Sequence, residues 1–155
     1  MTTVTLTPQE LSIAAYVGVR RSVSAKARGR EQAHGFAGGA QGWAIDCEGA
    51  AAELAVAKLL GRYWPMTIAR LDLDGDVDGG IHVRSTTRPD GSLILHPNDP
   101  DGDRFYLVTG EAPTFRVPGS ILAGAGKIDT YWREGDRPAY FIPQSALDPP
   151  TKGNP

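Results

Sequence analysis

The 155-residue chain has a single cysteine, Cys47, and no long run of apolar residues. One cysteine can form neither an intramolecular disulfide nor an all-cysteine zinc site, so we expect a protein of the reducing cytoplasm. No apolar stretch approaches the roughly 18 to 20 residues of a membrane-spanning helix. Residues 1–10 also lack the basic start and apolar core of a signal peptide. The sequence therefore predicts a soluble cytoplasmic protein without a membrane partner.

The chain likewise has no large excess of charge, with 16 Lys and Arg against 18 Asp and Glu and a net charge of −2. This balance argues against a protein coated with basic residues for nucleic acid, but it leaves room for a local basic face. Hydrophobic residues make up 41% and charged residues 22%, which are ordinary values for a globular protein. We expect one domain over residues 1–149 and a disordered tail over residues 150–155.

Two helices are predicted in the first 61 residues. Thr7 precedes a proline and is followed three residues later by Glu10, which is the pattern of a helix start with a capping box. A second helix is predicted from about Trp43 to Leu60, where Gly61 ends it. The segment 22–42 between them is rich in Gly, Ala and Arg and is predicted to be a mobile loop.

The pattern then changes to short strands separated by turn residues. We predict strands at 66–73, 80–87, 93–96, 105–109, 114–117 and 139–142, a short helix at 119–125 and a helical turn at 144–147. Helices followed by a strand meander are typical of an α+β fold, with the N-terminal helices packed on a mostly antiparallel or mixed sheet.

The most informative segment is Asp72-Leu-Asp-Gly-Asp-Val-Asp-Gly-Gly-Ile-His-Val-Arg84. Its aspartates occupy alternate positions and lead directly into a predicted strand. Because side chains alternate along a strand, His82 and Arg84 share one face, while Ile81 and Val83 share the other. A carboxylate-rich turn beside a strand that carries His and Arg could hold a divalent cation next to a phosphate.

A calcium-binding loop is the alternative interpretation of the same turn. Asp74, Asp76 and Asp78 match the first three ligand positions of an EF-hand loop. The twelfth position, however, is Ser85 instead of a bidentate glutamate, and the flanking patterns are not helical. A looser calcium loop that stabilises an interaction domain stays open.

Glu53 is an unusual carboxylate within the second predicted helix. Its neighbours three and four residues away are small or apolar, and Lys58, five residues away, cannot pair with it along the helix. Two interpretations stay open. Glu53 lies at the edge of the apolar face and reaches water, or it is kept for a metal or proton role despite the cost of desolvation.

Basic residues are clustered in one eleven-residue stretch, which contains five of them: Arg20, Arg21, Lys26, Arg28 and Arg30. One interpretation is a solvated helix end and linker. The other is an arm that contacts phosphates and becomes ordered on nucleic acid.

The order of a helical Glu, an Asp-rich turn and an x-His-x-Arg strand resembles the PD-(D/E)XK nuclease-like fold. It is most similar to small phage and actinobacterial proteins with the motif Asp-Val-Gly-x-x-(Glu/Gln)-Val-Arg. The resemblance covers residues 43–149. It includes Gly49-Ala-x-x-Glu-x-Ala-Val-x-Lys58, Leu107-Val-Thr-Gly-Glu-Ala-Pro113, Val117-x-Gly119-x-Ile121 and Pro138-Ala-Tyr-Phe-Ile-Pro-Gln144.

This resemblance implies a restriction-endonuclease-like core and Mg²⁺- or Mn²⁺-dependent hydrolysis of DNA. It places Glu53 at the helix position, Asp78 or Asp76 at the Asp position, His82 at the Glu/Gln position and Arg84 at the Lys position. The implied metal ligands are Glu53, Asp76, Asp78 and His82. Two departures stand out: His82 offers nitrogen where the family has oxygen, and Arg84 cannot lose a proton.

The resemblance also implies DNA as the partner of the basic stretch, leaves a homodimer open and, for a phage-encoded protein, implies the host cytoplasm. The alternative is a nuclease fold with a decayed site that acts as a nucleic-acid- or protein-binding module.

Overall fold

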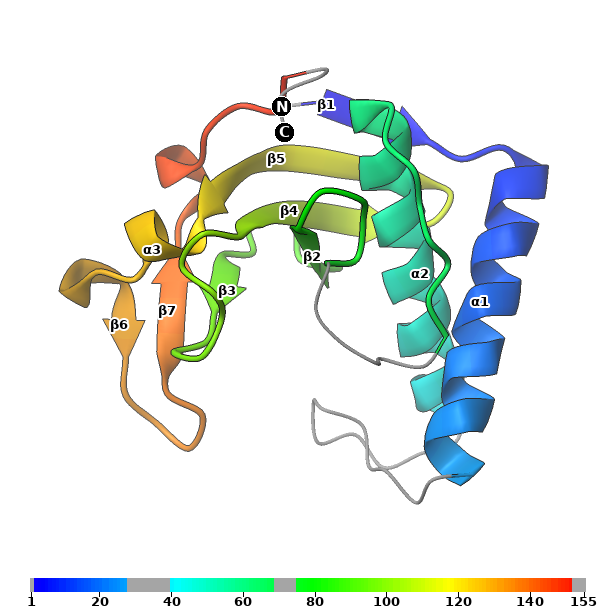
Figure 1. The fold of residues 1–155 in the computed structure, drawn as a ribbon, viewed down its shortest axis with the longest axis horizontal. Helices are drawn as coiled ribbons and strands as arrows, with labels where there is room; N and C mark the ends of the chain where they lie inside the picture. The colour runs from blue at the N-terminus through cyan, green and yellow to red at the C-terminus, as the bar shows by residue number, and fades with distance from the viewer. Residues whose placement is uncertain (1, 28–39, 69–74, 152–155) are drawn as a thin grey trace.

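The computed structural model describes residues 2–27, 40–68 and 75–151 (Figure 1). Two long helices, α1 (Pro8–Ala27) and α2 (Ala40–Leu60), lie side by side and form one layer of the fold (Figure 1). Within the described residues, neither helix nor any other is long and apolar enough to cross a membrane.

The start of α1 confirms the predicted capping box. The backbone N–H of Glu10 donates to Oγ1 of Thr7 at 3.2 Å, and the Thr7 N–H donates to Oε2 of Glu10 at 2.7 Å. These two bonds satisfy donors that a helix N-terminus leaves without intrahelical partners.

The predicted mobile loop over residues 22–42 was too long at both ends. Residues 22–27 belong to α1 and residues 40–42 to α2, while residues 28–39 lie outside the described part of the chain. Ser22 explains the longer first helix, because its side chain is buried and donates a hydrogen bond to Asp46 on α2. Packing against α2 thus extends a helix whose local composition favours a loop.

The main sheet has four strands: β1 (Thr2–Thr5), β2 (Ile81–Thr86), β4 (Arg104–Glu111) and β5 (Thr114–Leu122). Their spatial order is β1-β5-β4-β2. The β1–β5 and β4–β5 pairs are antiparallel, whereas β2 is parallel to β4. The sheet is therefore mixed, and with the helical layer it confirms the predicted α+β fold.

A second, smaller sheet in the order β3-β7-β6 lies on the other side of the main sheet from the helices (Figure 1). It is accompanied by short helical segments. These elements are β3 (Leu93–Leu95), β6 (Trp132–Arg133), β7 (Ala139–Ile142), α3 (Ala123–Gly126) and the 3-10 turns Asp129–Tyr131 and Gln144–Ala146.

Two hydrophobic cores cover the two faces of the main sheet. The first core contains Ile81, with Val83 packed against it, together with apolar residues of α1 and α2. The second contains Phe105 and Leu107 together with residues of β3 and β7. Ile81 and Val83 thus share one face of β2, as predicted, with His82 on the opposite face, and packing turns the Ile81 face toward the helices.

Several strand predictions need correction. Residues 66–68 are not in a strand, and residues 69–73 of that predicted strand lie outside the described part. Residues 119–122 continue β5 instead of starting a helix, because β5 pairs with β4 as far as Leu122. Two short strands were not predicted: β1, which pairs with the distant β5, and β6, which has only two residues and pairs with the neighbouring β7.

Candidate functional site

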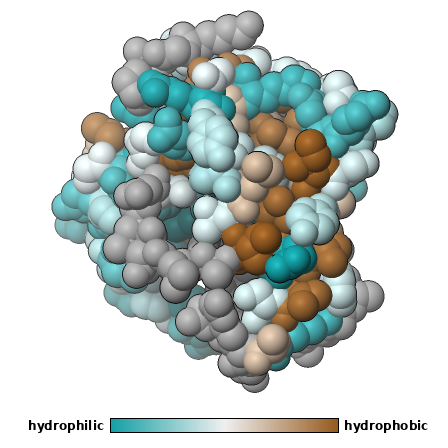
Figure 2. Space-filling model, turned by 45° about the vertical axis from the view of Figure 1, so that its right-hand side comes forward, coloured by the Kyte–Doolittle hydropathy of each residue, from teal (hydrophilic) through white to brown (hydrophobic). Residues whose placement is uncertain are grey.

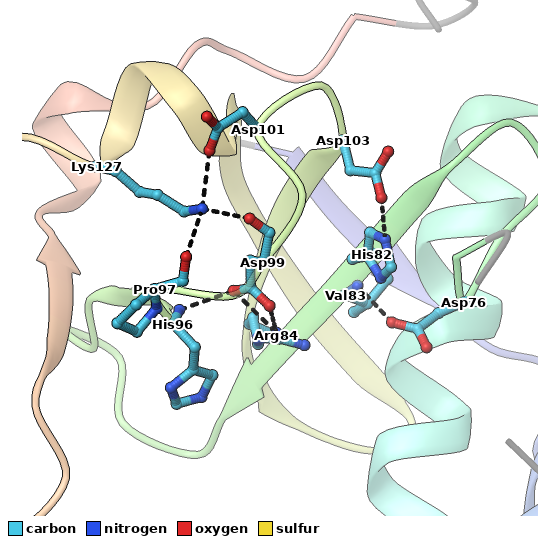
Figure 3. Close-up of polar contacts among 10 residues, drawn as sticks. All are labelled: Asp76, His82, Val83, Arg84, His96, Pro97, Asp99, Asp101, Asp103 and Lys127. Carbon is cyan, nitrogen blue, oxygen red and sulfur yellow. Dashed lines mark hydrogen bonds and ion pairs between the residues drawn. The ribbon is translucent and has the colours of Figure 1, made fainter. Parts of the chain in front are cut away.

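The Asp-rich turn closes tightly onto the start of β2, which is the end strand of the described sheet. Gly75 and Val77 both bridge to Ile81, and the φ of 87° at Gly75 suits glycine. This turn brings Asp76 to the edge of β2, where its Oδ2 accepts a hydrogen bond from the Val83 N–H at 2.8 Å (Figure 3). Asp76 is therefore fixed by a backbone donor of the strand edge.

Glu53 is buried on α2, with 7% of the residue exposed. The Arg21 guanidinium on α1 donates to both carboxylate oxygens, at 2.7 Å from Nη1 to Oε1 and 2.9 Å from Nη2 to Oε2. Trp64 Nε1 donates to Oε2 at 3.0 Å, and Arg21 Nε donates to the Thr67 carbonyl at 2.8 Å. The interpretation of Glu53 as an edge residue that reaches water is therefore wrong.

Competing effects act on the charge of Glu53. Removal from water raises the pKa of its carboxyl, and the negative charge of Asp76 acts in the same direction. The hydrogen bonds from Arg21 and Trp64 favour the carboxylate and lower this pKa, but the net shift is upward. Glu53 and Asp76 thus interact electrostatically between α2 and the edge of β2.

His82 and Arg84 lie on the other face of β2 and contact the second core (Figure 3). The His82 ring stacks on Phe105, with 4.5 Å between ring centroids and 12° between planes, and its Nε2 lies 2.9 Å from Oδ2 of Asp103. The Arg84 guanidinium carbon lies 4.9 Å from the Phe105 ring centroid, and Nη2 donates to the Asp99 carboxylate at 3.1 and 3.3 Å. The sheet thus separates this pair from Glu53.

Arg84 and Lys127 together hold the loop between β3 and β4 (Figure 3). The Asp99 carboxylate, which pairs with Arg84, also accepts from the His96 N–H at 2.8 Å. Lys127 Nζ donates to the carbonyl oxygens of Pro97 and Asp99 and, at 2.8 Å, to the Asp101 carboxylate. The partners of His82 and Arg84 are thus carboxylates from the segment 98–103, whose Asn-Asp-Pro-Asp-Gly-Asp composition is typical of a turn.

The described residues do not fit the Mg²⁺ or Mn²⁺ site that the resemblance implies. Both oxygens of Glu53 already accept N–H donors, and Asp78 is exposed on the turn. His82 contacts Asp103 on the far face of the sheet. Within the described ranges, no group of three or more His, Cys, Asp or Glu side chains could hold a metal ion. Asp72 and Asp74 of the turn lie outside these ranges.

The residues of the basic stretch differ in their surroundings. Arg21 forms an ion pair with Glu53, whereas Arg20 and Lys26 are exposed. Lys26 Nζ lies 4.3 Å from the centroid of the Trp43 ring, a cation–π contact that braces it against α2. Arg28 and Arg30 lie outside the described part of the chain.

Comparison of this chain with protein-family models, with curated proteins and with solved structures finds no match.

Proposed function

We propose that this chain is a nucleic-acid-binding protein with a PD-(D/E)XK-like scaffold in which an ion pair has replaced the metal site. The observation that carries the proposal is the paired contact of the Arg21 guanidinium with both oxygens of Glu53. The mixed sheet, the helical layer and the position of Glu53 on α2 are compatible with that scaffold.

A buried carboxylate requires a compensating positive charge. In a metal-dependent nuclease the ion supplies that charge, and in this chain the guanidinium supplies it. A metal ion bound to Glu53 would have to displace Arg21, which would leave a largely covered guanidinium without its partner. Breaking a buried pair in this way costs about 3–5 kcal/mol, so the ion pair disfavours metal binding.

Nucleic-acid binding is supported by the exposed cations in the second half of α1. Lys26 is held against Trp43, and the sequence continues to Arg28 and Arg30. Lysine and arginine neutralise backbone phosphates irrespective of base sequence, and the affinity then falls steeply with salt. Because the net charge is −2, we expect weak binding through this one basic face.

The test is fluorescence anisotropy with labelled single- and double-stranded DNA in EDTA, at low and high salt. We expect binding that weakens with salt and that Lys26→Glu weakens several-fold. Arg88→Glu is the matched control, since it changes the net charge equally at an exposed residue of the loop after β2. Absence of binding, or equal loss in both variants, would contradict the proposal.

An active metal-dependent nuclease is the second candidate. It is supported by the negative charge of Asp76, which raises the pKa of the Glu53 carboxyl and so indicates a second acidic group within electrostatic range of it. The test is cleavage of DNA with Mg²⁺ and with Mn²⁺, compared with EDTA and with Glu53→Gln. Cleavage that needs metal and is lost in Glu53→Gln would replace the first proposal.

A further inference from the structure

The outer face of α1 carries a line of exposed side chains. Ile13 is 48% exposed, Tyr16 is 59% exposed and Val23 is 47% exposed. With the exposed Arg20 they occupy positions i, i+3, i+7 and i+10 of the helix, and we refer to these four residues as the α1 stripe. The opposite face of α1, which includes Ala14, Val17 and Gly18, is buried.

The space-filling view shows apolar side chains gathered on the helical side of the molecule (Figure 2). Large side chains spaced three and four residues apart are the pattern of a helix that packs against another helix. Scattered apolar residues on a surface need no partner, but an aligned set on one helix face indicates an interaction site.

The α1 stripe is symmetric about its own midpoint. Ile13 and Val23 lie five residues on either side of position 18, and Tyr16 and Arg20 lie two residues on either side of it. In an antiparallel pair of α1 helices, Ile13 of each copy therefore lies opposite Val23 of the other copy. Arg20 of each copy lies opposite Tyr16 of the other. We propose that the α1 stripe binds the same stripe of a second copy of this chain, antiparallel about a twofold axis near residue 18.

Electrostatic attraction between the Arg20 guanidinium and the negative face of a tyrosine ring favours this partner and this orientation. Within one chain the Arg20 guanidinium already lies 5.9 Å from the Tyr16 ring centroid and donates to its hydroxyl at 3.3 Å. In the antiparallel dimer Arg20 lies over the tyrosine ring of the second copy, which is a cation–π contact. A parallel pair would instead oppose the two Arg20 side chains. The single acid of α1, Glu10, is paired with Lys58, so no acid in the helix competes for Arg20.

The stripe is short, which limits the strength of the contact. Stable interfaces bury roughly 800 Å² per partner, and three apolar side chains with one guanidinium supply less than that. We therefore expect a reversible dimer at high micromolar concentration. This inference does not depend on the proposed function.

The first test is sedimentation velocity over a concentration series from low micromolar to near-millimolar. We expect a shift from monomer to dimer that Ile13→Arg weakens at least tenfold. Ile128→Arg is the matched control, since Ile128 is an isoleucine with similar exposure, 44%, beyond α3. A monomer at every concentration, or a dimer that Ile13→Arg leaves intact, would overturn the inference.

The second test fixes the orientation by disulfide cross-linking in a Cys47→Ala background. A mixture of Ile13→Cys and Val23→Cys chains should cross-link as a heterodimer, because the two positions face each other. Chains with Ile13→Cys alone should not cross-link efficiently, since the two Cys positions lie about 15 Å apart along the helix axis. Efficient cross-linking of Ile13→Cys with itself, or none in the mixture, would overturn the antiparallel arrangement.

Discussion

Gly18 of α1 lies directly against the backbone of Cys47 of α2. A Cβ at position 18 would be 2.4 Å from Cα and 2.6 Å from the backbone N of Cys47. Such contacts are far shorter than van der Waals distances, so any larger residue forces the helices apart. Close approach of α1 and α2 at this point also brings Ser22 beside Asp46 and lets Arg21 reach Glu53.

We therefore expect Gly18→Ala to lower the free energy of unfolding by about 2–3 kcal/mol, despite the higher helix propensity of alanine. Chemical denaturation measures this change. Gly49→Ala in α2 is the control, because no atom lies within 4 Å of its added Cβ, and it should stabilise by up to about 1 kcal/mol. Equal effects of the two substitutions would contradict the close approach.

Removal of the charge on Arg21 should destabilise the protein in a pH-dependent way. Arg21→Met leaves Glu53 buried without its ion-pair partner, at a cost of about 3 kcal/mol near neutral pH. Because the pKa of Glu53 is already raised by burial, it rises further in the variant. As pH increases, Glu53 then ionises at a lower pH in the unfolded chain than in the folded protein. The free energy of unfolding therefore falls from about pH 4 up to the pKa of Glu53 in the folded variant. Denaturation at several pH values tests this dependence.

The control for this effect is Glu53→Gln in the Arg21→Met background. The amide cannot ionise, and its oxygen still accepts from Trp64, so the decline of stability with pH should disappear. If stability still declined with rising pH in the double variant, a titratable group other than Glu53 would be responsible.

The Glu10–Lys58 pair predicts the opposite dependence at acidic pH. The hydrogen bond from Lys58, with those at Thr7, lowers the pKa of Glu10. The stabilisation that ionised Glu10 gives to the fold is fully present above its unfolded pKa of about 4.3. It is lost as pH falls through the pKa of Glu10 in the folded protein. The pair is partly exposed, so we expect at most about 0.5 kcal/mol.

NMR titration of the Glu10 carboxyl measures this pKa directly. Lys58→Met should move it back toward its ordinary value, whereas Lys58→Arg should keep it low. An unchanged titration in Lys58→Met would show that Thr7 alone sets the shift.

Asp99 should be the most sensitive residue of the loop between β3 and β4. Asp99→Ala removes the partner of both Arg84 and the His96 N–H, with an expected loss of about 2 kcal/mol. Amide hydrogen exchange at His96 should accelerate. Asp90→Ala, at an exposed residue 3.8 Å from Arg88, should stay within about 0.5 kcal/mol. If the His96 amide remained protected from hydrogen exchange in Asp99→Ala, the Asp99 carboxylate would not be the acceptor that holds this N–H.

Local features of the fold could be predicted because they depend on neighbouring residues. The capping box at Thr7 and Glu10 is complete within four residues, and the alternation of Ile81, His82 and Val83 follows from the geometry of a strand. Residues 22–27 were predicted wrongly because the buried contact of Ser22 with Asp46 is absent from any local window.

The candidate site could be predicted only as a set of unusual residues. Glu53 stood out by its apolar surroundings, but its partner Arg21 is 32 residues away, in a stretch interpreted as either a solvated helix end or an arm that contacts phosphates. The partner of His82 is Asp103, and that of Arg84 is Asp99. Such pairs form when separate elements pack, and local periodicity carries no information about them.

The sequence alone determined the start of α1, the alternation of β2 and the two sets of side chains that this alternation creates. Only the tertiary structure decided which set faces the helices. A strand pattern separates two faces but does not say which of them a distant helix covers. Because α1 and α2 cover the face of Ile81 and Val83, Glu53 lies across the sheet from His82 and Arg84. The packing of the helical layer, which depends on many distant contacts at once, therefore determines which side chains can act together.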